Sequence, residues 1–154
     1  MKKIIWEYHK AFDIAQIEIA MIQRKENYLM VIQDLWAFFH EAPCKDMIEY
    51  MKIDDWSCMP ARSKTIEIDE SFFSKAYKTI TESLMPIYNA DHAQGLDGDG
   101  LTVKIESGGG HRCEFYFWAP GYYDKDRYKT DRVYEVFMCV LERAGLSEWY
   151  KASR

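Results

Sequence analysis

Several features that assign proteins to broad functional classes are missing from this sequence. No stretch approaches the roughly 20 consecutive apolar residues that a membrane-spanning helix needs. No block of Lys and Arg is present, and the net charge of -5 argues against nucleic-acid binding, because neutralising phosphates needs a basic face. The apolar run after Lys3 is interrupted by Glu7, His9 and Lys10 before the core of a signal peptide can form. The sequence therefore predicts a cytoplasmic protein that binds neither membranes nor nucleic acid.

Cysteine is also scarce, and its four copies are scattered along the chain. Cys44, Cys58, Cys113 and Cys139 include no C-x-x-C pair, and their spacing matches no compact zinc module. In a cytoplasmic domain such thiols are expected to be reduced and mostly buried. We therefore expect no disulfide framework, no metal and no cofactor.

The composition that remains is typical of a folded globular chain. The 154 residues are 48% hydrophobic and 16% aromatic, which is enough to build a core without disulfides. No internal repeat, low-complexity tract or Pro/Gly linker divides the sequence. We expect one domain over residues 1–154, of the α+β class, with antiparallel β-hairpins packed on helices.

Two segments show the spacing of amphipathic helices. The first covers about residues 70–85, with Asp69 or Ser71 as its N-cap and Pro86 as its stop. Its apolar residues recur every four positions: Phe72, Ala76, Ile80 and Leu84. The second covers residues 131–144, and Gly145 follows it where a left-handed C′ residue belongs.

The clearest β-structure is a hairpin formed by residues 101–107 and 111–118. Apolar and polar residues alternate in both segments, and the triple glycine at 108–110 supplies the loop. The pairs expected on one side are Ile105 with Cys113, Val103 with Phe115 and Leu101 with Phe117. The pairs expected on the other side are Glu106 with Arg112, Lys104 with Glu114 and Thr102 with Tyr116. Since both sides are chemically matched, the register is strongly specified.

The Asp-Gly-Asp-Gly before this hairpin resembles half of a calcium loop. With Gly100 at the sixth position, Asp97, Asp99 and Glu106 fall at the third, fifth and twelfth, but the first position is a glycine. Glu106 also belongs to the strand pattern, so we interpret the two aspartates as turn residues. A calcium site of another kind, with Asp91 as a further ligand, is the alternative.

Residues 14–42 admit two interpretations. A hairpin of 14–22 with 28–33 around a loop at 24–27 would place Met21 opposite Met30 and Ile19 opposite Ile32. One long helix is the alternative, because the segment contains neither Gly nor Pro. We favour the hairpin, followed by a short helix near residues 44–52.

Aromatic and charged residues gather at the end of the 101–118 hairpin and in the loop after it. Tyr and Trp are favoured at interfaces because they bury much area at little cost in side-chain entropy. One interpretation is that these rings cover the core from the loop side. The other is a recognition surface for a protein, which would consist of Tyr116, Trp118, Tyr122, Tyr123, Asp124 and Arg127.

An enzyme is the alternative functional class. His92 and His111 could form a small hydrolase site with Asp97, since catalytic residues converge from anywhere in a fold. The sequence has no G-x-S-x-G, phosphate-loop or H-E-x-x-H signature to support such a site.

Residues 97–146 resemble a group of small uncharacterised bacterial α+β proteins. The shared parts are the Asp-Gly turn, the hairpin that ends in "FWAP", the polar loop and the closing helix that ends in "ERAGL". Some of these proteins are immunity proteins of toxin systems. The resemblance implies a protein that binds a toxin without catalysis, with a basic nuclease as the partner of an acidic member. We therefore expect a protein-binding module whose partner is another, basic protein.

Overall fold

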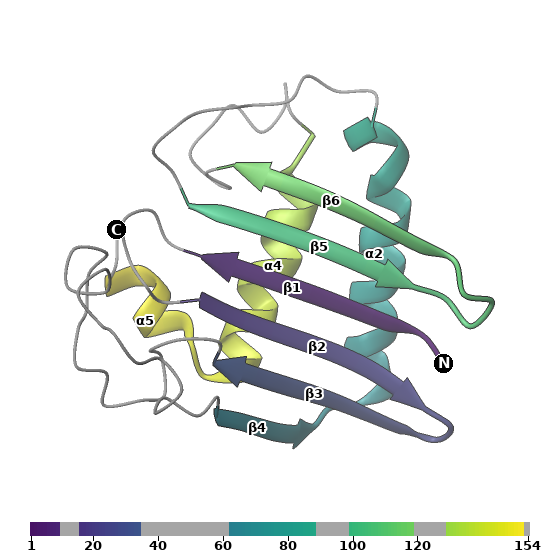
Figure 1. Cartoon of the computed structure of the whole chain (residues 1–154), viewed down its shortest axis with the longest axis horizontal. Coiled ribbons are helices and arrows are strands. Elements are labelled where there is room, and N and C mark those ends of the chain that lie inside the picture. The colour runs from purple at the N-terminus through teal and green to yellow at the C-terminus, as the bar shows by residue number, and fades with distance from the viewer. Residues whose placement is uncertain (10–15, 35–61, 89–98, 119–128, 153–154) are drawn as a thin grey trace, which may run out of the picture.

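The computed structural model describes residues 1–9, 16–34, 62–88, 99–118 and 129–152. Within them, one antiparallel sheet has the strand order β4-β3-β2-β1-β5-β6 (Figure 1). Its strands are β1 (Lys3–His9), β2 (Gln16–Arg24), β3 (Asn27–Asp34), β4 (Arg62–Glu67), β5 (Gly100–Glu106) and β6 (Arg112–Trp118). The helices are α2 (Glu70–Tyr88), α4 (Asp131–Ala144) and α5 (Ser147–Ala152). The expected α+β fold with antiparallel hairpins on helices is confirmed.

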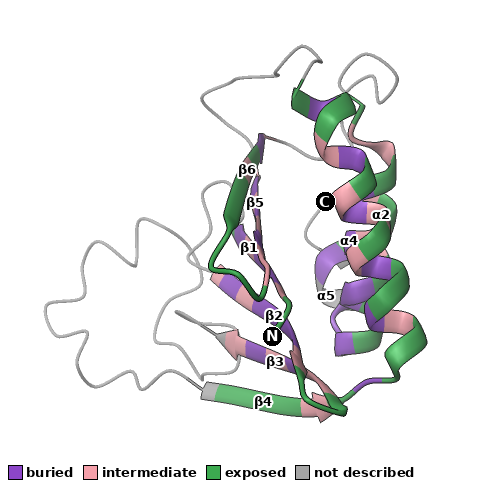
Figure 2. Ribbon diagram, turned by 90° about the vertical axis from the view of Figure 1, so that its right-hand side faces the viewer, coloured by how far each residue is buried: buried purple, intermediate pink, exposed green. Residues whose placement is uncertain are grey.

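The described helices all lie on one face of the sheet (Figure 2). The chain runs through β1 to β4 in spatial order, crosses behind the sheet as α2, and returns as the β5–β6 hairpin on the other side of β1. β1 is therefore central although it comes first, and β4 and β6 are the two edges.

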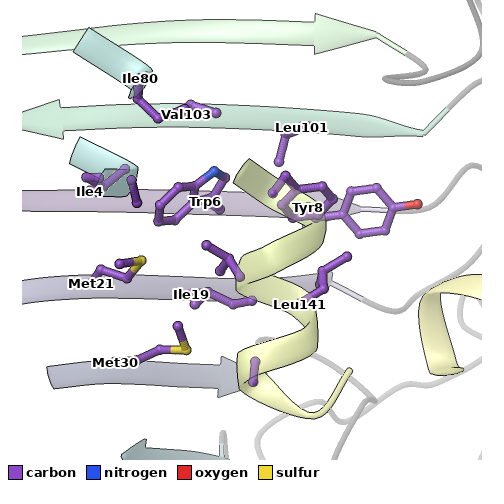
Figure 3. Packing of buried hydrophobic residues seen from close by; sticks show 14 of the residues in the cluster. Ile4, Trp6, Tyr8, Ile19, Met21, Met30, Ile80, Leu101, Val103 and Leu141 are labelled. Carbon is purple, nitrogen blue, oxygen red and sulfur yellow. The ribbon is translucent and has the colours of Figure 1, made fainter. Parts of the chain in front are cut away.

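The main core lies between this face and the helices. Alternate residues of the strands point into it because the side chains of a strand alternate between the two faces. Figure 3 shows Trp6 and Tyr8 of β1 among the apolar residues of this layer. The ring of Tyr8 lies 5.5 Å from that of Phe137 in α4 and 5.4 Å from that of Tyr150 in α5. Each such side chain contributes about 1.5–3 kcal/mol when fully buried.

Both predicted hairpins are present with the expected registers. Ile105 pairs with Cys113 and Leu101 with Phe117 in the β5–β6 hairpin. In the β2–β3 hairpin, Met21 pairs with Met30 and Ile19 with Ile32, so the long-helix alternative is wrong. The turn between β2 and β3 places Lys25 at a positive φ of 51°, and strand pairing extends from 16–24 to 27–34. The helix expected near residues 44–52 lies outside the described residues.

The expected end of the first helix at Pro86 is wrong, because α2 continues to Tyr88. A proline costs a helix the hydrogen bond that its missing N–H would donate and crowds the carbonyl one turn earlier. Here few residues follow Pro86, and Ile87 is buried against the core, which stabilises the last turn. At the other end, Asp69 caps the helix through the N–H of Phe72, at 2.7 Å.

The end of α4 agrees with the sequence pattern. Gly145 has a φ of 77°, and Leu146 donates its N–H to the carbonyl of Leu141 at 2.8 Å. This is the Schellman arrangement, which satisfies the last carbonyls of a helix. Thr130 occupies the N-cap without a side-chain hydrogen bond.

The expectation that the cysteines are mostly buried is wrong for the two that the structure describes. Cys113 and Cys139 are both free and exposed. Cys113 lies near the start of an edge strand, and Cys139 lies on the outer side of α4, in a shallow depression that Phe72 and Val136 also line. Cys44 and Cys58 lie outside the described residues.

Candidate functional site

The sheet has a second face, on which no described helix lies, and we call it the helix-free face (Figure 2). Because Ile4, Trp6 and Tyr8 point into the main core, the alternate residues of β1 point to this face. The pairing registers extend that assignment to the other strands. The helix-free face therefore carries Lys3, Ile5, Glu7, His9, Gln16, Glu18, Ala20, Ile22, Leu29, Val31, Gln33, Ser63, Thr65, Glu67, Gly100, Thr102, Lys104, Glu106, Arg112, Glu114, Tyr116 and Trp118.

This face divides into an apolar part and a polar part. Ile5, Ala20 and Ile22 form a small buried cluster of their own, with Val31 packed against it. Next to it, across β1, β5 and β6, the side chains are charged, hydroxylated or aromatic. Because the apolar cluster is buried, the part of the face that a partner can reach is the polar part, on which Tyr116 is an exposed ring.

An ion pair between Glu7 and Lys104 holds the polar part together. The Lys104 side chain is 15% exposed and the Glu7 side chain 26% exposed. The predicted cross-strand pairs, Lys104 with Glu114 and Glu106 with Arg112, are confirmed by the register. The ion pairs that form are others, because Lys104 bonds Glu7 and Arg112 bonds Glu114 at 3.2 Å. β1, which lies beside β5, supplies the carboxylate that Lys104 bonds. A long side chain also reaches the diagonal neighbour on the next strand.

Glu18 lies directly opposite Glu7 in the β1–β2 pairing. Both side chains are half-buried, and Lys104 compensates the charge of Glu7 only. Within the part of the chain that the structure describes, no Lys or Arg forms an ion pair with Glu18. Like charges in a cross-strand pair are unfavourable, so an external cation would stabilise this position.

Tyr116 is the exposed aromatic residue of this face, with 56% of its surface accessible. It lies opposite Thr102 on the edge strand β6, two residues before the half-buried Trp118. The interpretation that the rings cover the core therefore fails for Tyr116. Four other residues of the expected surface, Tyr122, Tyr123, Asp124 and Arg127, lie outside the described residues.

His9 has a role at the end of this face that the sequence pattern does not indicate. His9 pairs with Gly100 in the β1–β5 register, and its imidazole covers the glycine so closely that a Cβ there would overlap the ring. Gly100 pairs in turn with Trp118. Gly100, interpreted from the sequence as part of a turn, is thus required by a close side-chain approach.

Asp99, the second aspartate of the Asp-Gly-Asp-Gly segment, bonds Tyr8 of β1. The buried hydroxyl of Tyr8 donates a hydrogen bond to the Asp99 carboxylate, which ties the start of β5 to the core. Among the described residues, no three His, Cys, Asp or Glu side chains gather as metal ligands would. Asp91 and Asp97 lie outside the described residues.

The described residues bring together no part of the hydrolase site considered as the alternative. His111 is exposed beside the β5–β6 loop. Asp99, the described residue closest in sequence to Asp97, lies at the opposite end of β5. His92 and Asp97 lie outside the described residues, so this site stays a prediction.

Comparison with known proteins adds no relative. No family model, no curated protein and no solved structure matches the chain. None of the helices in the described residues is long and apolar enough to cross a membrane.

Proposed function

We propose that this protein is a binding module without catalysis, which contacts a basic partner protein through its helix-free face, with Tyr116 of β6 as the exposed aromatic contact. The observation that carries the proposal is the exposure of Tyr116, 56%, in the middle of a strand. A tyrosine held on a strand loses little freedom on binding, whereas the same ring on a loop must first be ordered. Tyrosines at the centre of an interface contribute about 2 kcal/mol or more.

The charges of this face support a basic partner. The cross-strand neighbour of Glu18 is another carboxylate, Glu7, and no Lys or Arg of the described residues forms an ion pair with Glu18. The whole chain carries a net charge of -5. A Lys or Arg from the partner would compensate Glu18 and would form a stronger bond once water is excluded. Opposite net charges also accelerate association, an effect that salt weakens.

The immunity-like role that the sequence resemblance implies, and the cytoplasmic location predicted from the N-terminal sequence, are part of the same proposal. Under it, the partner is a toxin, and a basic nuclease is the class that an acidic chain fits. The protein would act by covering the partner's surface, so no catalytic group is needed on its side.

The test is a pull-down of partners from lysate of the source cell, with mass spectrometry as the readout. We expect a stoichiometric basic protein with the native chain, and its loss with Tyr116→Ala and with Glu18→Lys. Tyr88→Ala is the matched control, because Tyr88 is 71% exposed but lies on α2. If Tyr88→Ala loses the partner while Tyr116→Ala and Glu18→Lys retain it, the binding surface lies on the helices instead.

A further inference from the structure

The outer edge of β6 carries backbone groups that no other described strand uses. At the hairpin loop, the N–H of Ser107 donates to the carbonyl of His111 at 3.0 Å, so His111 directs its backbone groups toward β5. In an antiparallel pair this direction alternates along the strand. The N–H and C=O groups of Arg112, Glu114 and Tyr116 therefore point away from β5, toward the open edge.

The side chains of β6 do not protect this edge. Its residues on the helix side are Cys113, Phe115 and Phe117, and the strand contains neither Pro nor Lys. Natural sheets discourage edge pairing with prolines, lysines, bulges or charges that point inward. Phe115 is half-buried although its pair partner Val103 belongs to the buried core, so the apolar layer continues to a strand edge that no described strand pairs with.

A second apolar feature lies at the same edge. The last turns of α2 reach past β6 in both views of the molecule (Figures 1 and 2). On these turns Met85 is 65% exposed and Tyr88 is 71% exposed. Among the described residues, an unpaired strand edge and exposed large side chains thus occur together at one side of the sheet.

We propose that β6 pairs with β6 of a second copy of this chain, in an antiparallel dimer whose two-fold axis passes through Phe115. This register pairs all seven residues of the strand. It places Phe115 beside Phe115, Cys113 beside Phe117, Glu114 beside Tyr116 and Arg112 beside Trp118. The hydrogen-bonded pairs are Glu114 with Tyr116 and Arg112 with Trp118, whose backbone groups face outward as the alternation requires.

Other two-fold registers are less favourable. An axis at Glu114 would place two glutamates directly opposite each other, which is destabilising. An axis at Cys113 or at Tyr116 would leave part of the strand unpaired. A shift by a single residue would bring polar side chains against the core side. Of these registers, only the one with its axis at Phe115 both pairs the whole strand and places compatible side chains opposite each other.

The dimer would have one continuous sheet with all helices on the same face. Because α2 crosses the sheet nearer the Arg112 end of β6, the two-fold axis places the two α2 ends on opposite sides of Phe115 (Figure 1). Each α2 end would then cover part of the other copy's sheet. This inference is independent of the proposed function, since it concerns the purified chain alone.

The first test measures the molar mass of the purified protein by sedimentation or light scattering between about 1 and about 100 µM. We expect the mass to rise from 18.3 kDa toward twice that value. A molar mass that stays at that of one chain over the whole range overturns the proposal. This holds even if a strand of another protein pairs with β6 in lysate.

A pair of proline variants locates the interface. Tyr116→Pro removes an outward N–H and keeps the bonds to β5, as prolines on edge strands do. Thr65→Pro is the control on β4, where the N–H of Ile68 donates to Tyr28 at 3.0 Å and Thr65 therefore points its N–H outward. We expect Tyr116→Pro to raise the dimer dissociation constant at least about tenfold and Thr65→Pro to leave it unchanged. A dimer that Tyr116→Pro does not weaken overturns the assignment.

A crosslink tests the register and covers the case in which Tyr116→Pro does not fold. In the proposed dimer, position 115 faces itself in a non-hydrogen-bonded pair, where Cα atoms lie about 4.5 Å apart. Phe115→Cys in a Cys113→Ser background should form a covalent dimer on mild oxidation, and the Cys113→Ser parent should not. Absence of this crosslink in a folded Phe115→Cys variant overturns the register.

Discussion

The two edge strands of the sheet differ in how they meet solvent. On β4, Lys64 pairs with the buried Ile32 and so lies on the helix side of the sheet, where it is nevertheless exposed. The corresponding side of β6 carries only Cys, Phe and Phe. A charge that points inward makes pairing with another strand costly, because the new strand would cover it. β4 is therefore built as a closed edge and β6 as an open one.

The two ends of α2 repeat this difference. At the end that follows β4, Asp69 caps the helix and bonds Arg143 of α4 at 3.1 Å. At the β6 end, the helix passes through Pro86 and finishes with exposed Met85 and Tyr88. Polar groups are satisfied at one side of the molecule, and apolar groups are left uncovered at the other.

The largest expected effect concerns how far the core extends under each edge. We expect Phe117→Ala on β6 to lower the free energy of unfolding by about 3–5 kcal/mol, because Phe117 is buried. Ile66→Ala on β4 should cost only about 1–2 kcal/mol, since Ile66 is half-buried. Urea unfolding of both variants measures the difference. Equal losses would mean that the two edges are packed alike.

Exchanging the character of the two edges should give the next largest effect. Phe115→Lys gives β6 the inward lysine of β4, and we expect this variant to stay a monomer. Lys64→Phe gives β4 the apolar inner side of β6, so that each molecule has two open edges and can form chains longer than a dimer. Light scattering against concentration measures both. A Lys64→Phe variant that behaves as the native chain would show that Lys64 does not protect β4.

The sequence predicted the elements whose local pattern is complete. The β5–β6 hairpin has alternating residues on both strands and a glycine loop, and the β2–β3 hairpin has matched apolar pairs. Both patterns are decided within about 20 neighbouring residues, so no knowledge of the rest of the fold is needed.

β1 and β4 were not predicted from the sequence, for physical reasons. β1 is central and has buried residues on both faces, so Ile4, Ile5 and Trp6 are consecutive and do not alternate. β4 is an edge and mostly polar, with Ile66 as its single large apolar residue. Because β1 was missed, the bond of Lys104 to Glu7 and the position of Glu18 beside Glu7 could not be predicted. In contrast, the exposure of Tyr116 could be predicted from the register of the β5–β6 hairpin, which places Tyr116 opposite Thr102 on the polar side.

The smallest expected effect is a pH dependence at the start of α2, near the closed edge. Hydrogen bonds from Ser71 and from the N–H of Phe72 lower the pKa of Asp69 from its ordinary value of 3.8, and the charge of Arg143 lowers it further. A carboxylate whose pKa is lowered by folding stabilises the protein above the unfolded-state pKa, and this contribution is lost as the pH falls through the folded-state pKa. The loss should therefore occur below pH 3.8.

Asp69→Asn isolates this charge, because Asn is as good an N-cap as Asp. We expect the native chain to have a slightly higher melting temperature than Asp69→Asn at neutral pH, and the two to converge as the pH falls below 3.8. Thermal unfolding followed by circular dichroism from about pH 7 to about pH 2.5 measures the gap. Because Asp69 is exposed, salt should narrow the part of the gap that comes from Arg143. If the difference in melting temperature between the two proteins is unchanged at the lowest pH, it comes from packing and not from charge. The ionised form of Asp69 would then not stabilise the start of α2.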